Sequence, residues 1–318
     1  MLLLLLSACE PSPYGVYATA IDNHRKSVAA APCKTDSVNA LATTLAEAGD
    51  GPAAMQVYSD FHAACGENKT LMSKHLDLAI QLADHAKAIE LAQALSDGKP
   101  NSPYADQLVA ELALAGRQDE ALTLRRQQVA ARGSKGHRQL RALAELQEEL
   151  QKPCDAMVTW GQLWFVSPEL RGTAGTAIAT LEGQHPECEG VQLKEEGKVR
   201  QDPSDGYWRF ETQLAGKELW LGLDTSAAWT YVDAAAMEGA EGVTEVMPHL
   251  SMLTGVGTLE GKLVHVDSIQ VGTVTFKNVD LLVVPRLPSK IDGFLALNVS
   301  SRMGMRELND RYWSIAPL

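Results

Sequence analysis

The sequence places one aspartate where an acid–base residue would be held firmly. Residues 219–227 read Leu-Trp-Leu-Gly-Leu-Asp-Thr-Ser-Ala, so an apolar strand ends at Asp224 and small residues follow it. A carboxylate fixed at the end of a buried strand can exchange a proton with a substrate or with water. Asp224, Thr225 and Ser226 are therefore the first candidates for a catalytic site.

Other kinds of site have weaker support in the same part of the chain. Serines and histidines that could form a hydrolase dyad are present, but no Gly-x-Ser-x-Gly sequence positions a nucleophile. The acids Asp202, Asp205 and Asp233 do not lie in a loop with the alternating oxygen donors of a calcium site. No cysteine pair has the spacing of a zinc knuckle, so we expect neither a metal nor another cofactor.

The segment with Asp224 resembles the active-site strand of the retropepsin-like aspartic peptidases, and the later segments follow in that family's order. Residues 254–257 fall where the family has its flap, and residues 267–272 match its next strand and turn. Residues 291–298 resemble the Asp-Gly-Ile-Leu-Gly segment that packs against the active site. The resemblance covers about residues 205–318 and depends on the order and spacing of these segments.

The resemblance implies an aspartic endopeptidase that hydrolyses peptides or proteins. In that family two aspartates share one proton, and one activates water while the other protonates the scissile carbonyl oxygen. This chain has one Asp-Thr sequence, so it supplies one aspartate of the pair. A homodimer through the β domain would have to supply Asp224 twice, once from each chain. Thr225 would then hydrogen-bond across the dyad. The flap that closes over the substrate would contain Thr254, Gly255, Val256 and Gly257.

Three positions depart from the family pattern and keep a second interpretation open. Ser226 replaces the glycine that follows Asp-Thr, while Ala296 replaces a glycine and Asn298 an aspartate in the later segment. The alternative is a noncatalytic envelope scaffold or peptide-binding lipoprotein, in which the β domain binds a peptide or self-associates. The sequence leaves both an active peptidase and an inactive relative open.

A β domain must position these segments, and the composition changes to that of a β domain near residue 189. Gly, Val, Thr and alternating apolar residues replace the helix formers from there on. We predict an all-β retropepsin-like barrel over residues 200–318, with a short helix over 299–303. The predicted strands cover residues 208–214, 218–223, 229–232, 262–271, 274–284 and 312–315.

The segment before the β domain repeats a short sequence motif, called here a phrase, that begins with alanine. The phrase starts at Ala54, Ala88, Ala121 and Ala156, at intervals of 34, 33 and 35 residues, and a turn precedes each copy. This period resembles that of tetratricopeptide repeats, in which stacked helical hairpins share one core. We therefore predict a tetratricopeptide-like helical repeat domain over residues 35–188. It would either recruit a protein partner or act as a helical spacer.

The first nine residues resemble the signal segment of a bacterial lipoprotein. A run of leucines is followed by Ser7, Ala8 and Cys9, which is similar to a lipobox, and the run is too short to cross a bilayer. The resemblance implies cleavage before Cys9 and a lipid on that cysteine. Residues 10–34 would form a tether at the cell envelope. The outer membrane is favoured, with the domains facing the periplasm or the exterior.

The remaining cysteines fit an exported protein, and the net charge limits the kinds of partner. Cys33 with Cys65 and Cys154 with Cys188 is the simplest of three possible disulfide pairings. The net charge of -12 argues against a nucleic-acid partner, because binding to phosphates needs clustered Lys and Arg. The helical repeat and the change of composition near residue 189 together predict a multidomain α and β protein, with the helical repeat first and the barrel second.

Overall fold

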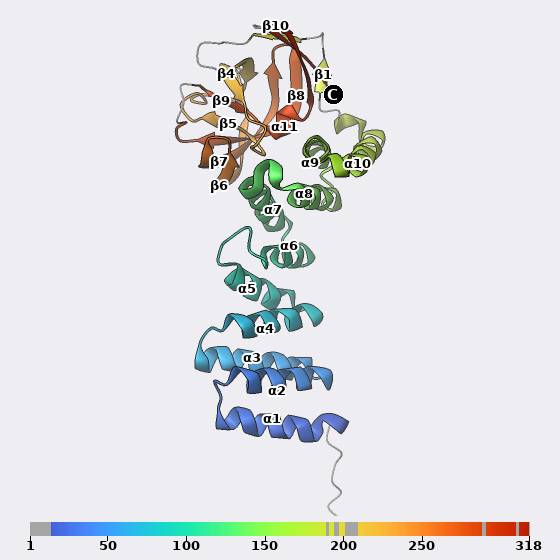
Figure 1. Cartoon of the computed structure of the whole chain (residues 1–318), viewed down its shortest axis with the longest axis vertical. Coiled ribbons are helices and arrows are strands. Elements are labelled where there is room, and N and C mark those ends of the chain that lie inside the picture. Colours follow the sequence, from blue (N-terminus) through green and yellow to red (C-terminus); the bar gives the residue numbers. More distant parts are fainter. Residues whose placement is uncertain are drawn as a thin grey trace, which may run out of the picture. The chain divides into compact units, whose positions relative to one another are not determined.

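The computed structural model describes residues 14–188, 191–193, 197–200, 209–287, 291–309 and 312–317 (Figure 1). Within this part of the chain, helices come first and strands follow, which confirms the predicted fold class. The chain forms two compact units, Met1–Arg117 and Gln118–Leu318. The boundary lies inside the predicted helical repeat, so the last helices belong to the same compact unit as the barrel. Cys9 and the rest of the predicted signal segment lie outside the described residues.

The helices follow one another as short antiparallel hairpins. Those of the first unit are α1 (Ala18–Ala30), α2 (Thr35–Glu47), α3 (Gly51–Cys65), α4 (Lys69–Gln81), α5 (His85–Ser96) and α6 (Ala105–Leu114), after the 3-10 turn η1 (Gly15–Tyr17). Those of the second unit are α7 (Gln118–Arg132), η2 (Gly133–Lys135), α8 (His137–Glu149), α9 (Pro153–Val166), η3 (Pro168–Leu170), α10 (Arg171–Gln184) and η4 (Pro186–Cys188). Among the described helices, none is long and apolar enough to cross a membrane.

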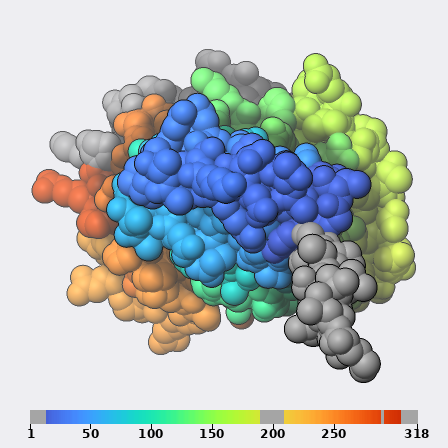
Figure 2. Space-filling view, turned by 90° about the horizontal axis from the view of Figure 1, so that it is seen from below, coloured from blue at the N-terminus to red at the C-terminus, as the bar shows by residue number. Residues whose placement is uncertain are grey.

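Part of the predicted tether folds as a helix. The tether was expected over residues 10–34, but Ala18–Ala30 form α1, which covers the N-terminal end of the helical stack (Figure 2). Ile21 is completely buried and packs in a core with Val38 and Leu41 of α2. Ile21 is the single buried residue of α1, so the apolar pattern of this segment is too weak to predict a helix from the sequence.

The repeated phrases lie on every second helix and begin each time with a buried alanine. They fall on α3, α5, α7 and α9, and the alanine in each has no exposed surface: Ala54, Ala88, Ala121 and Ala156. A methyl side chain at this position allows the two helices of a hairpin to approach closely. The predicted repeat is therefore present as a packing unit.

The turn before each of these helices has the same backbone geometry. A residue with positive φ occupies it at Gly49, Ala83, Gly116 and Gln151. The next amide donates to a carbonyl five residues earlier, as in Asp50 N to Leu45 O and Lys152 N to Gln147 O. These turns therefore recur at the predicted intervals even where the glycine has been replaced.

Two disulfides lie at the ends of the helical segment. Cys33 is bonded to Cys65 in the first unit, and Cys154 to Cys188 in the second. This is the pairing that the sequence favoured. The second bond ties η4, the last helical turn before the strands, to the start of α9.

The β domain is a closed ring of strands with a small second sheet. Its elements are β1 (Val191–Leu193), β2 (Gly197–Arg200), β3 (Phe210–Leu214), β4 (Lys217–Leu223), β5 (Thr230–Asp233), β6 (Val243–Thr254), β7 (Gly257–Val271), β8 (Val274–Val284), β9 (Gly293–Leu295), α11 (Leu297–Ser300), β10 (Met303–Asn309) and β11 (Tyr312–Pro317). The large sheet has the order β1-β8-β5-β9-β4-β3-β7-β6, and β7 also pairs with β8, which closes the ring. The small sheet has the order β10-β11-β2.

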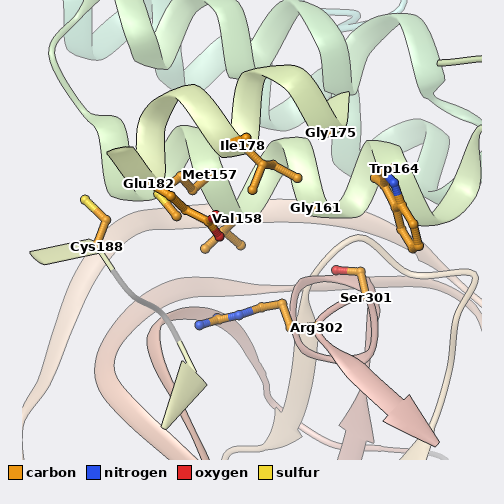
Figure 3. A pocket seen from close by; sticks show the side chains of 11 residues that line it. Met157, Val158, Gly161, Trp164, Gly175, Ile178, Glu182, Cys188, Ser301 and Arg302 are labelled. Carbon is orange, nitrogen blue, oxygen red and sulfur yellow. The ribbon is translucent and has the colours of Figure 1, made fainter. Parts of the chain in front are cut away.

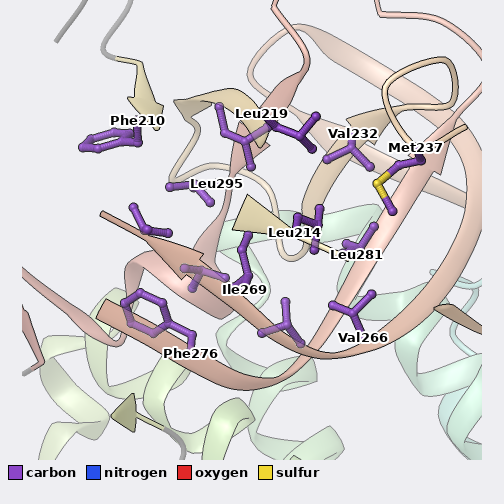
Figure 4. Packing of buried hydrophobic residues seen from close by; sticks show 14 of the residues in the cluster. Phe210, Leu214, Leu219, Val232, Met237, Val266, Ile269, Phe276, Leu281 and Leu295 are labelled. Carbon is purple, nitrogen blue, oxygen red and sulfur yellow. The ribbon is translucent and has the colours of Figure 1, made fainter. Parts of the chain in front are cut away.

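Apolar side chains fill the inside of this ring (Figure 4). Phe210, Leu214 and Thr212 of β3 are buried while the residues between them are exposed, as expected for a strand with one face on a core. Phe276 of β8 and Leu295 of β9 are completely buried in the same cluster. The core therefore joins strands from both ends of the domain.

The sequence did not predict β6, the long strand that carries the flap. Pro248 interrupts its pattern, and the pairing with β7 is irregular between Met247 and Leu250. A proline is tolerated because β6 is the last strand of the sheet and pairs only with β7 in the described part of the chain. The short helix predicted over 299–303 is present slightly earlier, as α11.

Candidate functional site

Two segments that lie far apart in the sequence form the base of the site. β4 and β9 run parallel, with Leu223 opposite Leu295, and the amide of Asp224 donates to Leu295 O at 2.9 Å. A side chain on Gly222 would collide with the ring of Phe294, at 2.7 Å from its nearest carbon. The glycine of the Asp-Thr segment is therefore needed for the pairing that places Asp224.

The carboxylate of Asp224 accepts four hydrogen bonds from its own chain. Oδ1 receives the amide of Ser226 at 2.9 Å and its hydroxyl at 2.5 Å. Oδ2 receives the hydroxyl of Tyr231 at 2.9 Å and the amide of Gly255 at 2.7 Å. Asp224 is only 9% exposed, so these donors take the place of water around the charge.

These donors hold Asp224 in its charged form. Burial alone raises the pKa of the carboxyl, but the hydrogen bonds from Ser226, Gly255 and Tyr231 together outweigh it, and the pKa lies below its ordinary value. The side chain is therefore ionised at neutral pH. A general acid needs the opposite shift, because it must hold a proton at the working pH.

The predicted flap lies directly over the carboxylate. Thr254 stabilises the turn at the end of the flap. Its hydroxyl donates to Gly257 O at 2.6 Å and accepts from the amide of Val256 at 3.2 Å. A Cβ on Gly255 would lie 3.1 Å from Asp224 Oδ1, so a glycine allows the close approach. Asp224, Ser226 and the predicted flap residues thus come together, whereas Thr225 is exposed.

Helical residues of the second unit bind the loop that follows Asp224. The amide of Ser134 in η2 donates to Ser226 O at 2.9 Å, and Gln162 Nε2 of α9 donates to Ala228 O at 3.0 Å. A Cβ on Gly133 would lie 2.2 Å from Ser226 O, so η2 is in direct contact with the loop. Nothing in the sequence predicted these contacts, since Ser134 and Gln162 resemble ordinary polar residues of surface helices.

The two substituted positions of the later segment are well accommodated. Asn298 is 2% exposed, and its Oδ1 accepts the amide of Thr230 at 2.8 Å and its hydroxyl at 3.0 Å. Its Nδ2 donates to Asp280 O at 2.6 Å, which an aspartate in this place could do only when protonated. Ala296 is completely buried, and its amide donates to Thr230 Oγ1 at 3.2 Å.

A partly buried group of charges joins the helices to the barrel. Arg126 of α7 lies 3.7 Å from Asp155 of α9 and 3.5 Å from Asp280 of β8. Asp280 also accepts a hydrogen bond from His265 Nδ1 at 2.9 Å. This hydrogen bond raises the pKa of His265 more than burial lowers it. Asn278 completes the group by donating to Asp155 at 3.0 Å.

Trp229, which follows this loop, is part of the core. It is 5% exposed. Within the described residues, no group of three or more His, Cys, Asp or Glu side chains is placed to hold a metal ion.

Comparison with known proteins agrees with the two-part architecture. Residues 210–299 match the family model described as "Aspartyl protease". No curated protein matches the chain. The chain therefore has tetratricopeptide-like helical repeats followed by an aspartyl-protease-like β domain.

Several solved structures of repeat proteins are similar over about half of the chain. The MamA protein is 14% identical, with a TM-score of 0.36, and the match covers 54% of this chain and 86% of that one. YrrB, "a TPR protein with an unusual peptide-binding site", is 12% identical with a TM-score of 0.38, covering 52% and 84%. The C-terminal part of a TPR repeat-containing protein from Cytophaga hutchinsonii is 15% identical with a TM-score of 0.39, covering 54% and 67%.

Proposed function

We propose that this protein is a noncatalytic scaffold of the cell envelope, in which the helical repeat recruits a protein partner and the aspartyl-protease-like domain no longer cleaves peptides. The observation that carries the proposal is the set of four hydrogen bonds to Asp224 from Ser226, Tyr231 and Gly255. With both carboxylate oxygens occupied by its own chain, Asp224 acts as an internal acceptor that fixes the flap to the barrel.

The packing around the loop after Asp224 supports the same proposal. An aspartate dyad needs a second carboxylate beside Asp224, and a second copy of this loop would have to bring it. Ser134 and Gln162 already bind the backbone oxygens of this loop at Ser226 and Ala228. A second loop would therefore have to displace η2 and α9, together with the ion pairs of Arg126.

The place of the protein in the cell is part of the proposal. Cys9 carries a lipid that anchors the chain to a bacterial membrane, the outer membrane being favoured, and the domains face the periplasm or the exterior. The disulfides Cys33–Cys65 and Cys154–Cys188 support an oxidising compartment. Incorporation of labelled palmitate in the wild type, and its loss in Cys9→Ser, tests the anchor.

A peptide-cleavage assay tests whether the β domain has peptidase activity. The Cys9→Ser chain, which lacks the proposed anchor, is incubated with a broad peptide library between about pH 3 and 7, the range in which carboxylate dyads titrate. We expect no cleavage, while Asp224→Asn lowers the melting temperature because Asp224 is structural. Cleavage that vanishes in Asp224→Asn would overturn the proposal.

The second candidate function is the aspartic endopeptidase acting as a homodimer through its β domain. The position of the flap favours it, because the Gly255 amide lies 2.7 Å from Asp224 and could cover a substrate after a small displacement. This candidate requires dimers at the concentration of the assay. Light scattering of the Cys9→Ser chain therefore separates the two, since a strict monomer cannot place two copies of Asp224 together.

A further inference from the structure

A cavity of about 370 Å³ lies away from the aspartate, where α9 and α10 face the segment after α11 (Figure 3). Most of its wall is apolar, with Met157, Val158 and Trp164 from α9 and Ile178 from α10. Its volume falls in the range of small-molecule sites, which is about 300–1,000 Å³. The cavity lies within the second compact unit.

Glycines on the facing helices leave this space open. Gly161 of α9 and Gly175 of α10 both line the cavity. A Cβ on Gly161 would meet no atom within 4 Å, and one on Gly175 would only touch the indole of Trp164 at 3.8 Å. Glycine in the middle of a helix is destabilising relative to alanine. The helices thus carry residues that weaken them at the two positions where a larger side chain would fill the cavity.

The barrel side of the cavity is polar and positively charged. Ser301 is 4% exposed, and its hydroxyl has no hydrogen-bond partner among the described residues. Arg302 is 9% exposed, donates to Lys277 O at 2.8 Å and lies 5.6 Å from the ring of Phe276. Figure 3 shows the two side chains together on this side, opposite the apolar residues of the helices.

The charge of Arg302 is retained in this environment. Burial lowers the pKa of its guanidinium to about 10, which still leaves it charged at neutral pH. Glu182 also lines the cavity, but it is exposed and its charge is screened by solvent. The buried end of the cavity therefore favours an anion.

We propose that this cavity binds an aliphatic carboxylate such as a medium-chain fatty acid, with the chain between α9 and α10 and the carboxylate at Ser301 and Arg302. Each methylene group removed from water stabilises such a complex. The carboxylate would satisfy the Ser301 hydroxyl, which otherwise stays buried without a partner, and would form a charge-assisted interaction with the guanidinium.

Calorimetric titration of the Cys9→Ser chain with dodecanoate, below its micelle-forming concentration, tests the proposal. We expect saturable binding with a dissociation constant in the micromolar range. Dodecyltrimethylammonium has the same chain and the opposite charge, so we expect it to bind at least about tenfold more weakly. Equal affinity for the two amphiphiles, or no binding of dodecanoate by the folded protein, would refute the proposal.

Two variants locate the site. Gly161→Leu fills the cavity from α9, and we expect it to weaken dodecanoate binding by at least about tenfold. Gly183→Leu is the matched control, because Gly183 lies on α10, is exposed and has no atom near its Cβ position. Unchanged binding by Gly161→Leu would overturn the assignment.

Ser301→Ala provides an independent readout that does not depend on filling the cavity. Loss of one hydrogen bond to a charged group should weaken dodecanoate binding by about tenfold. The affinity for dodecyltrimethylammonium should not change. An equal loss for both amphiphiles would indicate a disturbed cavity and would contradict the placement of the carboxylate at Ser301.

Discussion

The hydroxyl of Tyr231 donates to Asp224 Oδ2 at 2.9 Å from a side chain that is completely buried in the barrel. The ring of Tyr231 also stacks on Phe294, with centroids 5.1 Å apart, so its position is fixed by β9. One tyrosine thus links the charge of Asp224 to the strand that carries the later family segment. The carboxylate of Asp224 is therefore hydrogen-bonded to a side chain of the barrel core.

Replacing Tyr231 by phenylalanine should therefore destabilise the β domain. The variant removes one of the donors to Oδ2 and leaves the ring contacts in place. A hydrogen bond to a charged group contributes about 1.5–3 kcal/mol, and we expect a loss of that size in the free energy of unfolding. Urea denaturation followed by circular dichroism measures it. Tyr104→Phe, at a half-buried position outside the β domain, is the control.

Asn298→Asp, which restores the residue of the family pattern, should weaken the fold at neutral pH. The new carboxylate would place an oxygen at 2.6 Å from Asp280 O, where Asn298 now donates a hydrogen bond. We expect a loss of about 2–4 kcal/mol in the free energy of unfolding at pH 7.

The same variant should regain part of its stability near pH 4, because a protonated carboxyl can donate to the carbonyl. Denaturant titrations at both pH values measure this, with the exposed Asn23→Asp as control. A variant as stable as the wild type at pH 7 would contradict the assigned orientation of the Asn298 amide.

Gly133→Ala should disrupt the contact between η2 and the loop of Asp224. Gly133 has a φ of +52°, and its Cβ position lies 2.2 Å from Ser226 O. Backbone strain and the collision together should cost about 2 kcal/mol or more. The amide of Ser134, which donates to Ser226 O, should exchange its hydrogen faster in the variant. Gly172→Ala serves as control, because its Cβ meets no atom within 4 Å.

His75 should make the stability of the first unit depend on pH. It is 1% exposed, stacks on His62 with centroids 5.9 Å apart, and its ring nitrogens have no hydrogen-bond partner among the described residues. Burial, then the charges of Lys87 and His62, lower the pKa of His75 to about 4, against the opposite effects of Glu90 and Asp84.

The sign of the effect follows from the direction of this shift. The unfolded chain binds a proton near pH 6.5 and the folded chain near pH 4, so stability is full above about pH 6.5 and falls as the pH is lowered towards 4. The shift corresponds to about 3 kcal/mol at most. His75→Leu should remove this dependence in denaturation experiments at pH 7, 5 and 4, whereas the exposed His249→Gln should retain it.

The sequence predicts most of what depends on local pattern. The repeat is visible because the buried alanine must recur wherever two helices approach closely, as at Ala54 and Ala121. The adjacency of the Asp224 segment and residues 291–298 follows from a family pattern that reflects the pairing of β4 with β9. Strand β6 was not predicted because Pro248 interrupts the alternation of apolar and polar residues that identifies a strand.

What depends on packing between the helices and the barrel could not be predicted. Arg126 is buried between Asp155 and Asp280, although on α7 it looks like one of several solvated basic residues. Gln162 reaches a carbonyl 66 residues later in the chain. Polar residues that bind a distant backbone follow no periodic pattern. The sequence therefore predicted neither the contacts of Ser134 and Gln162 with the loop after Asp224 nor the hydrogen bond of Tyr231 to Asp224.

The parallel pairing of β4 with β9 also sets an order of events during folding. The amide of Asp224 donates to Leu295 O, 71 residues later, so the surroundings of the aspartate cannot form until that part of the chain has been made and the large loop between them has closed. The helical hairpins of the first unit are built from neighbouring segments of the chain, so they can form while the chain is still emerging. We therefore expect the helices to be assembled before the aspartate is enclosed, so that the barrel closes beside helices that already exist.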